Sequence, residues 1–258
     1  MGDIKKIIKY KRYLIPKIIG MFFLTSLIII FFLVPNNSLK PEHINNRSNI
    51  CICMWYDDGV KEYANLARKI NKKYCETHKY DFIYDNERRL KNRDPTWECI
   101  PCLLNAMKKN NYEYVVWIDA DAFFRMKPEN DLMREIINSH NDKYLILSED
   151  IDGKDIMNAG FMIIKNNEYT RKLLNDIINS DIPECRKYKE IFHEQECICH
   201  LYRNNIYNTT DNSVILPFGE LQTFNPKENE TSLIIHLAGW NREERIKTIE
   251  EFKKKYNV

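Results

Sequence analysis

The chain has 258 residues, of which 44% are apolar and 29% are charged, and its formal net charge at pH 7 is +2. This length and apolar content are typical of a packed globular protein and exclude a chain that is disordered throughout. The charge is uneven, because the first 17 residues hold six basic side chains and one acidic side chain, which leaves the rest mildly acidic. A mildly acidic body argues against binding to nucleic acid, whose protein partners are usually basic.

Residues 18–34, "IIGMFFLTSLIIIFFLV", contain no charged side chain. With "YLIP" upstream, across the single Lys17, the apolar stretch reaches the roughly 20 residues that span a bilayer. Because the basic cluster precedes it, we predict a cytoplasmic tail (1–17), an uncleaved transmembrane anchor (18–34) and a body outside the cell or in a lumen. A cleaved signal peptide is the alternative, although "FLVPNNS" lacks a small-x-small cleavage site.

Residues 35–49, "PNNSLKPEHINNRSN", are polar, contain two prolines and show no apolar period. This composition predicts a stem, followed by a folded domain over residues 50–258. In that domain we expect strands over 50–56, 80–85, 112–118, 143–150, 158–166, 213–218 and 232–240, and helices over 60–78, 96–110, 128–140, 168–180, 193–205 and 241–256. Strands that alternate with helices predict an α/β/α sandwich with a mostly parallel central sheet.

Two aspartates interrupt an apolar stretch in "YVVWIDADAFF", residues 114–124. An aspartate is costly to bury unless it is paired or bound to a metal. In an extended backbone Asp119 and Asp121 point the same way, so that they can share one hard cation, Mg²⁺ or Mn²⁺. Such a cation usually completes its coordination with substrate phosphates and water. An Asp-x-Asp sequence alone is a weak signal, and a surface loop is the ordinary alternative.

A histidine ends a late apolar strand in "LIIHLAGW". Such a residue is more often part of the core than a ligand, but beside a two-aspartate site His236 is a candidate third metal ligand through its neutral imidazole. Gly239, three residues on, would let the backbone approach a phosphate.

Two further short sequences hold candidate site residues. In "MNAGFMII" we expect Asn158 and Gly160 to form a tight turn at a strand start that allows close approach of a sugar-sized ligand, and an ordinary turn is the alternative. In "HEQE" Glu194 and Gln195 begin a predicted helix, where acidic residues are also ordinary capping groups.

All eight cysteines lie in the body, an even number that is compatible with disulfides whose pairing the sequence does not give. "CIPC" at 99–102 resembles a redox motif or half a zinc site, but we expect it inside a helix without a second pair and interpret it as structural. Glycosylation sequons at Asn36, Asn46, Asn208 and Asn229 are weak support for a lumenal glycoprotein.

The order and spacing of "NKKYCETHKYDF", "TWECIPCLLNAM", "YVVWIDADAFF", "NAGFMIIKN", "HEQE" and "IIHLAGW" resembles glycosyltransferase family 34 over residues 50–245. This family contains Golgi galactosyl-, mannosyl- and xylosyltransferases. The resemblance implies a GT-A fold in a type II membrane protein of the Golgi or endoplasmic reticulum, with a lumenal catalytic domain. It also implies transfer of a hexose or pentose from a UDP- or GDP-linked donor to a glycan or glycoprotein acceptor, with retention of anomeric configuration.

The resemblance extends to single residues of the expected metal and donor site. Asp119 and Asp121 match the family's Asp-x-Asp, which binds Mn²⁺ (or Mg²⁺) and the donor diphosphate. His236 matches its C-terminal metal ligand. Asn158 and Gly160 match the Asn-x-Gly turn near the donor sugar and the acceptor.

The reaction centre is also carried over, with two departures. Glu194 and Gln195 match the family's acidic-Gln pair, which lies beside the reacting sugar carbon. Family members usually have a lysine where this chain has Cys99, and they often place another after the His-x-x-Gly, where Asn241 stands here. We therefore expect Arg242 to contact the diphosphate in its place.

Two other functions remain open at the level of the sequence. The missing lysines are compatible with a catalytically inactive, membrane-tethered protein that binds a sugar nucleotide. The less favoured one is an Asp-x-Asp phosphohydrolase with Asp119 as its nucleophile. Such enzymes typically have a threonine or valine soon after the pair, whereas Ala122 and Phe123 follow here.

Overall fold

A computed structural model describes residues 42–44, 48–109, 111–151, 153–179, 182, 185, 194–227 and 229–258. The chain divides into two compact units, Met1–Leu39 and Lys40–Val258, and the second contains all of these residues. The predicted tail and anchor lie outside the described residues. Within the described residues, no helix combines the length and the apolar character that crossing a bilayer requires.

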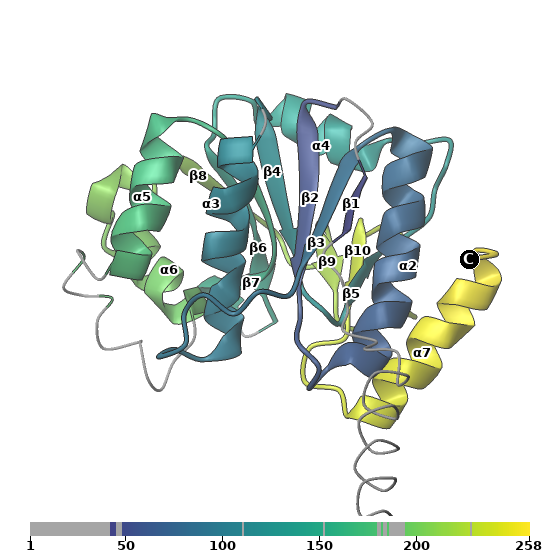
Figure 1. The fold of residues 1–258 in the computed structure, drawn as a ribbon. Helices are drawn as coiled ribbons and strands as arrows, with labels where there is room; N and C mark the ends of the chain where they lie inside the picture. The colour runs from purple at the N-terminus through teal and green to yellow at the C-terminus, as the bar shows by residue number, and fades with distance from the viewer. Residues whose placement is uncertain are drawn as a thin grey trace, which may run out of the picture. The chain divides into compact units, whose positions relative to one another are not determined.

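The central sheet has seven strands in the order β1-β3-β2-β4-β7-β6-β8 (Figure 1). These are β1 (Glu42–Ile44), β2 (Ile50–Trp55), β3 (Asp81–Asp85), β4 (Tyr114–Ile118), β6 (Leu145–Asp150), β7 (Gly153–Lys165) and β8 (Ser213–Leu216). The pairs β2–β3, β2–β4 and β6–β8 are parallel, whereas β1–β3, β4–β7 and β6–β7 are antiparallel. The predicted mostly parallel sheet is therefore mixed, because the β6–β7 hairpin places β7 beside β4.

Helices cover both faces of this sheet. They are α2 (Lys61–His78), α3 (Cys99–Lys109), α4 (Leu132–Ser139), α5 (Glu168–Asn179), α6 (Glu194–Arg203) and α7 (Arg242–Lys255), with short 3₁₀ helices η1 (Pro95–Glu98) and η3 (Ile206–Asn208). Side chains alternate along β2, so Cys53 contacts Cys102 of α3 while Met54 contacts Asn71 of α2. All six residues of β2 are buried, as expected for a strand covered on both faces.

A second, three-stranded sheet has the order β5-β10-β9, formed by β5 (Ala122–Phe124), β10 (Ile234–His236) and β9 (Gln222–Thr223). Strand β10 falls within the predicted strand over 232–240, but β5 and β9 were not expected. The ring of Phe124 stacks on Tyr74 of α2 with a centroid distance of 3.8 Å, which anchors β5 to the body. This sheet joins the turn after β4 to a segment more than a hundred residues later in the chain.

Strand β1 lies within the range predicted as a stem. It pairs antiparallel with β3 at the edge of the central sheet, with Ile44 opposite Phe82. An edge strand can form through backbone hydrogen bonds alone, so the absence of an apolar period did not reveal it.

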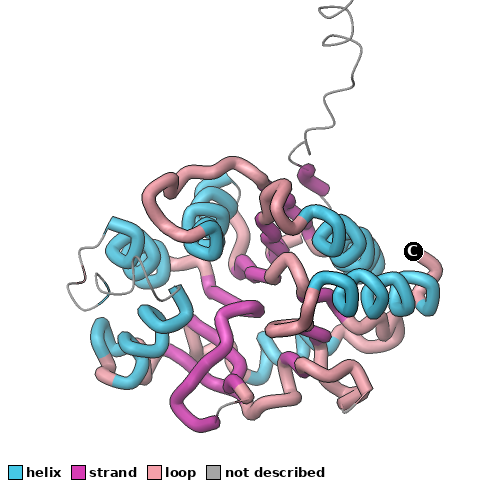
Figure 2. The backbone as a smooth tube through the Cα atoms, turned by 90° about the horizontal axis from the view of Figure 1, so that it is seen from below, coloured by secondary structure: helices cyan, strands magenta, loops and turns pink. Residues whose placement is uncertain are grey.

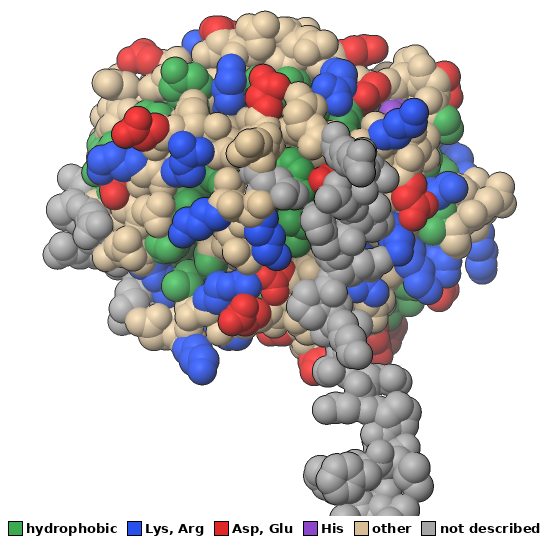
Figure 3. Space-filling model, turned by 45° about the horizontal axis from the view of Figure 1, so that its top comes forward, with side chains coloured by type: hydrophobic (Ala, Val, Ile, Leu, Met, Phe, Trp, Pro, Cys, Tyr) green, Lys and Arg blue, Asp and Glu red, His purple; other side chains and the backbone are tan. Residues whose placement is uncertain are grey.

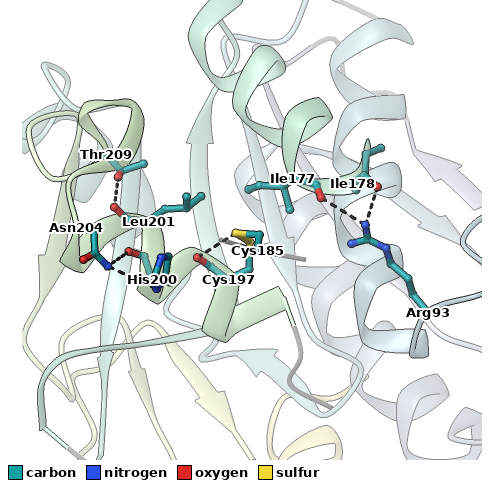
Figure 4. The surroundings of a disulfide bond; sticks show 9 residues. All are labelled: Arg93, Ile177, Ile178, Cys185, Cys197, His200, Leu201, Asn204 and Thr209. Atoms are coloured by element: carbon teal, nitrogen blue, oxygen red, sulfur yellow. Dashed lines mark hydrogen bonds between the residues drawn. A yellow bond between two sulfur atoms is a disulfide. The ribbon is translucent and has the colours of Figure 1, made fainter. Parts of the chain in front are cut away.

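A disulfide joins Cys185 to Cys197 of α6 (Figure 4). The other six cysteines are free and buried, including Cys99 and Cys102 of α3, so the "CIPC" sequence packs in the core. Outside the core, Figure 3 shows basic and acidic side chains interspersed on one face.

The carboxyl ends of β2, β3 and β4 and the first turns of α2 and α3 lie at the lower end in Figure 1, which Figure 2 shows from below. Ligands of open α/β sheets bind outside the carboxyl ends of the strands. The candidate site residues lie at this end.

Candidate active site

The two aspartates occupy the tight turn between β4 and β5. The amide of Asp119 donates to the carbonyl oxygen of Gly160 at 2.9 Å, and the amide of Ala122 donates back to the carbonyl oxygen of Asp119 at 3.1 Å. The carbonyl oxygen of Asp121 accepts from the amide of Leu237, just after β10, at 3.1 Å. The backbone of the pair is therefore fixed by β7 on one side and by the segment after β10 on the other.

His236 ends β10 and lies opposite Ala122 in the antiparallel register. Its Nε2 is 3.3 Å from Oδ1 of Asp121 and 3.7 Å from Oδ2 of Asp119. One ligand atom from each of the three residues lies within 4.8 Å of the other two, and this is the only such His, Cys, Asp or Glu cluster that the described residues contain. The structure thus brings the three sequence-predicted metal ligands together.

The other carboxylate oxygens of this cluster are occupied by protein donors. Oδ1 of Asp119 accepts from the indole Nε1 of Trp117 at 2.7 Å. Oδ2 of Asp121 lies 2.9 Å from Nη2 of Arg245. Because these contacts hold the carboxylates, each turns its remaining oxygen toward His236.

The ionisation of these groups shows that the cluster attracts positive charge. Burial raises the pKa of Asp119 to about 6, against the lowering effect of His236. Burial also opposes ionisation of Asp121, but His236 and Arg245 outweigh it and lower its pKa. Burial disfavours protonation of His236, yet the two carboxylates raise its pKa. Two carboxylate oxygens and an imidazole nitrogen that converge in this way fit a divalent cation.

The cluster lies in the wall of a pocket of about 510 Å³, a volume within the range of small-molecule sites. The pocket is lined by Thr96, Asp119, Asp121, Asn158, Ala159, Gly160, Glu194, Gln195, Glu196, His236, Ala238, Gly239 and Arg245. Eight of the nine residues that the sequence singled out for the site share this pocket, and Arg242 is the exception.

Opposite the cluster, α6 and β7 supply amide and carboxyl groups. The Gln195 side chain accepts from the amide of Ala159 at 2.9 Å through Oε1 and donates to Oδ2 of Asp150 at 3.4 Å through Nε2. The same Asp150 oxygen accepts from Nδ2 of Asn158 at 3.0 Å. Both amides are therefore held by the protein, with Asp150 as their common acceptor.

Glu194 differs from its neighbours. Its side chain is buried, and its Oε2 has no hydrogen-bond partner among the residues that the structure describes. Burial raises the pKa of Glu194 to about 7, and the charge of Asp119 adds to this effect. A buried carboxyl with a free oxygen in a pocket is a candidate for contact with a substrate.

Gly160 does not open the expected turn. It lies inside β7, where its amide donates to Oδ1 of Asn158 at 2.9 Å. A Cβ at this position would lie 2.1 Å from Cε1 of His236. Its lack of a side chain therefore makes room for the imidazole, a steric reason that the sequence did not reveal.

The structure does not bring Arg242 to the pocket. Its guanidinium pairs with exposed Glu62 of α2 at 3.0 Å and donates to the carbonyl oxygen of Gly59. The arginine at the pocket is Arg245, three residues later on α7. The two positions are neighbours on α7, but the Arg242 guanidinium reaches Glu62 and Gly59, whereas that of Arg245 reaches Asp121.

Sequence analysis missed Arg245, Asp150 and Gln222, whose Oε1 lies 3.0 Å from Nδ1 of His236. Arg245 carried a usable signal, since it lies on the helix that follows the His-x-x-Gly. Asp150 ends a predicted strand, as Asp119 follows one. Gln222 carried none, because its two-residue strand has no recognisable pattern.

The mixed central sheet, with the Asp-x-Asp turn after β4 and His236 of the small sheet beside it, has a GT-A-like fold. Residues 47–141 match the sequence profile of the galactosyl transferase GMA12/MNN10 family. This match supports the resemblance to glycosyltransferase family 34 over residues 47–141.

A distant relative is an uncharacterized alpha-1,2-galactosyltransferase of Schizosaccharomyces pombe, 24% identical over 224 residues. The alignment covers 70% of this chain and 64% of the relative, so the chain spans less than two thirds of that protein.

Solved structures show the same fold. A glycosyltransferase involved in glycosylation of the major capsid of PBCV-1 superposes with a TM-score of 0.65 and 16% identity, covering 78% of this chain and 98% of that one. The glycosyltransferase GlyE of Streptococcus pneumoniae gives a TM-score of 0.50 and 14% identity, covering 82% and 65%.

Proposed function

We propose that this chain is a metal-dependent, retaining glycosyltransferase that moves a hexose or pentose from a UDP- or GDP-linked sugar to a glycan or glycoprotein acceptor. The observation that carries the proposal is the convergence of Asp119 Oδ2, Asp121 Oδ1 and His236 Nε2 in the wall of the pocket. Because the Schizosaccharomyces pombe relative is described as an alpha-1,2-galactosyltransferase, galactose is the first donor sugar to test.

Asp119, Asp121 and His236 would hold Mn²⁺, since the imidazole ligand is less suited to Mg²⁺, which prefers oxygen. When bound, the cation neutralises the charge that grows on a departing nucleotide diphosphate. Gly239 has a φ of 76°, a conformation that favours glycine. Because it has no side chain, the backbone at this position can approach a phosphate closely.

On the opposite wall, Glu194 is the candidate group for the reacting sugar carbon. The side-chain oxygen of Gln195 already accepts a backbone hydrogen bond, whereas Oε2 of Glu194 is free. Retention requires either same-face attack by the acceptor hydroxyl or a covalent intermediate. In both cases an ionised Glu194 stabilises the positive charge on the sugar ring, so we expect transfer to increase with pH through about 7.

We also propose that residues 18–34 anchor the enzyme as a type II membrane protein of the Golgi or endoplasmic reticulum. The uncharged apolar run and the basic residues before it support this orientation. The Cys185–Cys197 disulfide supports an oxidising compartment for the folded domain.

The test is incubation of the full chain with a panel of UDP- and GDP-linked sugars and mixed glycan acceptors, with Mn²⁺ or with EDTA. Release of nucleotide that depends on Mn²⁺ is expected for at least one donor. Calorimetric binding of a donor without release would instead indicate an inactive binding protein. Release of inorganic phosphate from simple esters would indicate a phosphohydrolase that uses Asp119.

A further inference from the structure

The imidazole of His236 is enclosed on three sides by residues that are not candidate ligands. Gly160 of β7 lies against its edge, and the ring of Phe224 meets it edge to face with a centroid distance of 5.4 Å. On the third side, Oε1 of Gln222 is 3.0 Å from Nδ1. The ring therefore has one orientation, with Nε2 toward the aspartates.

Gln222 is placed by the small sheet. It is fully buried in β9, which pairs parallel with β10, and its register partner is Ile234. Within the described part of the chain, its Nε2 has no hydrogen-bond partner. An unpaired buried amide group is unfavourable, so packing alone does not explain a glutamine here. The contact of its Oε1 with the imidazole of His236 explains why a glutamine stands at this position.

The chemistry of this contact fixes where the hydrogen of the imidazole lies. An amide oxygen only accepts a hydrogen bond, so this orientation of the Gln222 amide places the hydrogen of His236 on Nδ1. A neutral imidazole has one ring hydrogen, and with that hydrogen on Nδ1 the lone pair lies on Nε2. Nε2 lies 3.3 Å from Asp121 Oδ1 and 3.7 Å from Asp119 Oδ2, so this lone pair is directed at the position that a cation shared with the two carboxylates would occupy.

We propose that Gln222 is a positioning residue: it selects the Nδ1–H tautomer of His236 and thereby makes Nε2 available to a divalent cation. This inference rests on the proposed function for the identity of the cation site. Outer residues that hold a ligating histidine typically change metal affinity 10- to 100-fold when they are replaced.

The test measures binding of Mn²⁺ alone to the full chain, from the electron paramagnetic resonance signal of free Mn²⁺. The Gln222→Met variant keeps the volume but lacks the acceptor, so its dissociation constant should increase at least about tenfold. The Gln222→Glu variant keeps an acceptor oxygen, so its constant should stay within about threefold of the wild-type value. The matched control is Thr223→Val, in the same strand as Gln222. It removes the hydrogen bond from the Thr223 hydroxyl to the carbonyl oxygen of Asn225, and it should change the dissociation constant for Mn²⁺ less than about twofold.

A second readout uses the chain loaded with diamagnetic Zn²⁺. The ¹⁵N chemical shifts of the wild-type imidazole should show Zn²⁺ on Nε2 and hydrogen on Nδ1, and that hydrogen should exchange with solvent faster in Gln222→Met. Zn²⁺ on Nδ1 with hydrogen on Nε2 in the wild type would overturn the inference, even if the methionine variant failed to fold.

Three binding results would also overturn it: wild-type affinity in Gln222→Met, equal losses in Gln222→Met and Thr223→Val, or no Mn²⁺ binding by the wild type. The last would defeat the proposed metal site as well. Mn²⁺ binding with the expected variant pattern, but no transfer from any donor, would defeat the proposed function and leave the role of Gln222 in place.

Discussion

The two walls of the pocket differ in how completely their polar atoms are paired. On the cluster side, Asp119 and Asp121 each have one oxygen held by a protein donor and one turned toward His236. On the α6 side, both polar atoms of the Gln195 amide have a partner, but Glu194 retains a buried oxygen that has none among the described residues.

This difference indicates that one wall is arranged to bind a cation and the other to contact the substrate. The cluster side is rigid and negative, as suits a site that binds the same cation in every cycle. On the α6 side, the Glu194 carboxyl has one buried oxygen, Oε2, without a partner among the described residues, which costs stability in the free protein, as expected of a group whose partner is the substrate. Replacements on the two sides should therefore give different combinations of lost metal binding, lost transfer and changed stability.

The largest effect is expected on the cluster side. Asp121→Asn removes a charged ligand, so metal-dependent transfer should fall at least about 1,000-fold, corresponding to several kcal/mol of transition-state stabilisation. Donor turnover with Mn²⁺ measures this, and circular dichroism checks that the variant is folded. Asp142→Asn, an exposed position, serves as the control. Unchanged turnover in Asp121→Asn would refute the assignment of this residue.

Gly160→Ala tests the space for His236 without altering a ligand. Because the new Cβ would lie 2.1 Å from Cε1 of the imidazole, the ring must move, and we expect transfer and Mn²⁺ affinity to fall by about 100-fold or more. Gly153→Ala is the matched control: nothing lies within 4 Å of its Cβ, although its φ of 106° makes the substitution strained. The control should lose stability but keep Mn²⁺ affinity, and a similar loss of affinity in both variants would contradict the steric account.

Glu194→Gln probes the opposite wall. Since the folded-state pKa is raised from 4.5 to about 7, the unfolded chain ionises first as the pH increases, and the wild type loses stability between these values. The neutral amide avoids this penalty. At pH 8 its free energy of unfolding should exceed that of the wild type by up to about 3 kcal/mol, with little difference below pH 4.5.

Urea unfolding at pH 4.5 and 8 measures the stability of Glu194→Gln, and Mn²⁺ titration and donor turnover complete the comparison. Glu194→Gln should lose transfer but keep its affinity for Mn²⁺, whereas a general structural defect would lower both. A variant that is less stable than the wild type at pH 8 would show that Glu194 is paired after all.

The smallest effect is expected for Arg245→Met, which leaves Oδ2 of Asp121 without its partner. We expect a loss of about 1–3 kcal/mol in the free energy of unfolding without metal. Added Mn²⁺ should raise the melting temperature more in the variant than in the wild type, because the cation replaces the lost positive charge. Arg242→Met, which breaks an exposed pair with Glu62, should change stability by less than about 0.5 kcal/mol. Equal losses in the two variants would contradict the buried role of Arg245.

The sequence predicted those parts of the fold that a continuous apolar pattern defines. Strands β2, β3 and β4 are buried throughout, so their apolar residues set them apart from the helices. The pattern did not reveal that β7 is antiparallel to β4, because a strand's direction depends on its neighbours and not on its own residues.

The candidate site was predictable where chemistry and order along the chain coincide, as for Asp119, Asp121 and His236. It was not predictable where a residue acts through a neighbour. Gln222 lies in a two-residue strand, and only the register of β9 with β10 brings it to His236. Arg242 was chosen by its place in the sequence, but the direction of α7 brings Arg245 to the pocket instead.

The central claim is that Asp119, Asp121 and His236 hold one divalent cation. Pulsed electron paramagnetic resonance of the Mn²⁺-loaded chain tests it most directly, because this measurement detects nitrogen bound to the ion. The account predicts coupling to one histidine nitrogen in the wild type and its loss in His236→Gln. Bound Mn²⁺ without nitrogen coupling in the wild type, or with the same coupling in His236→Gln, would contradict it.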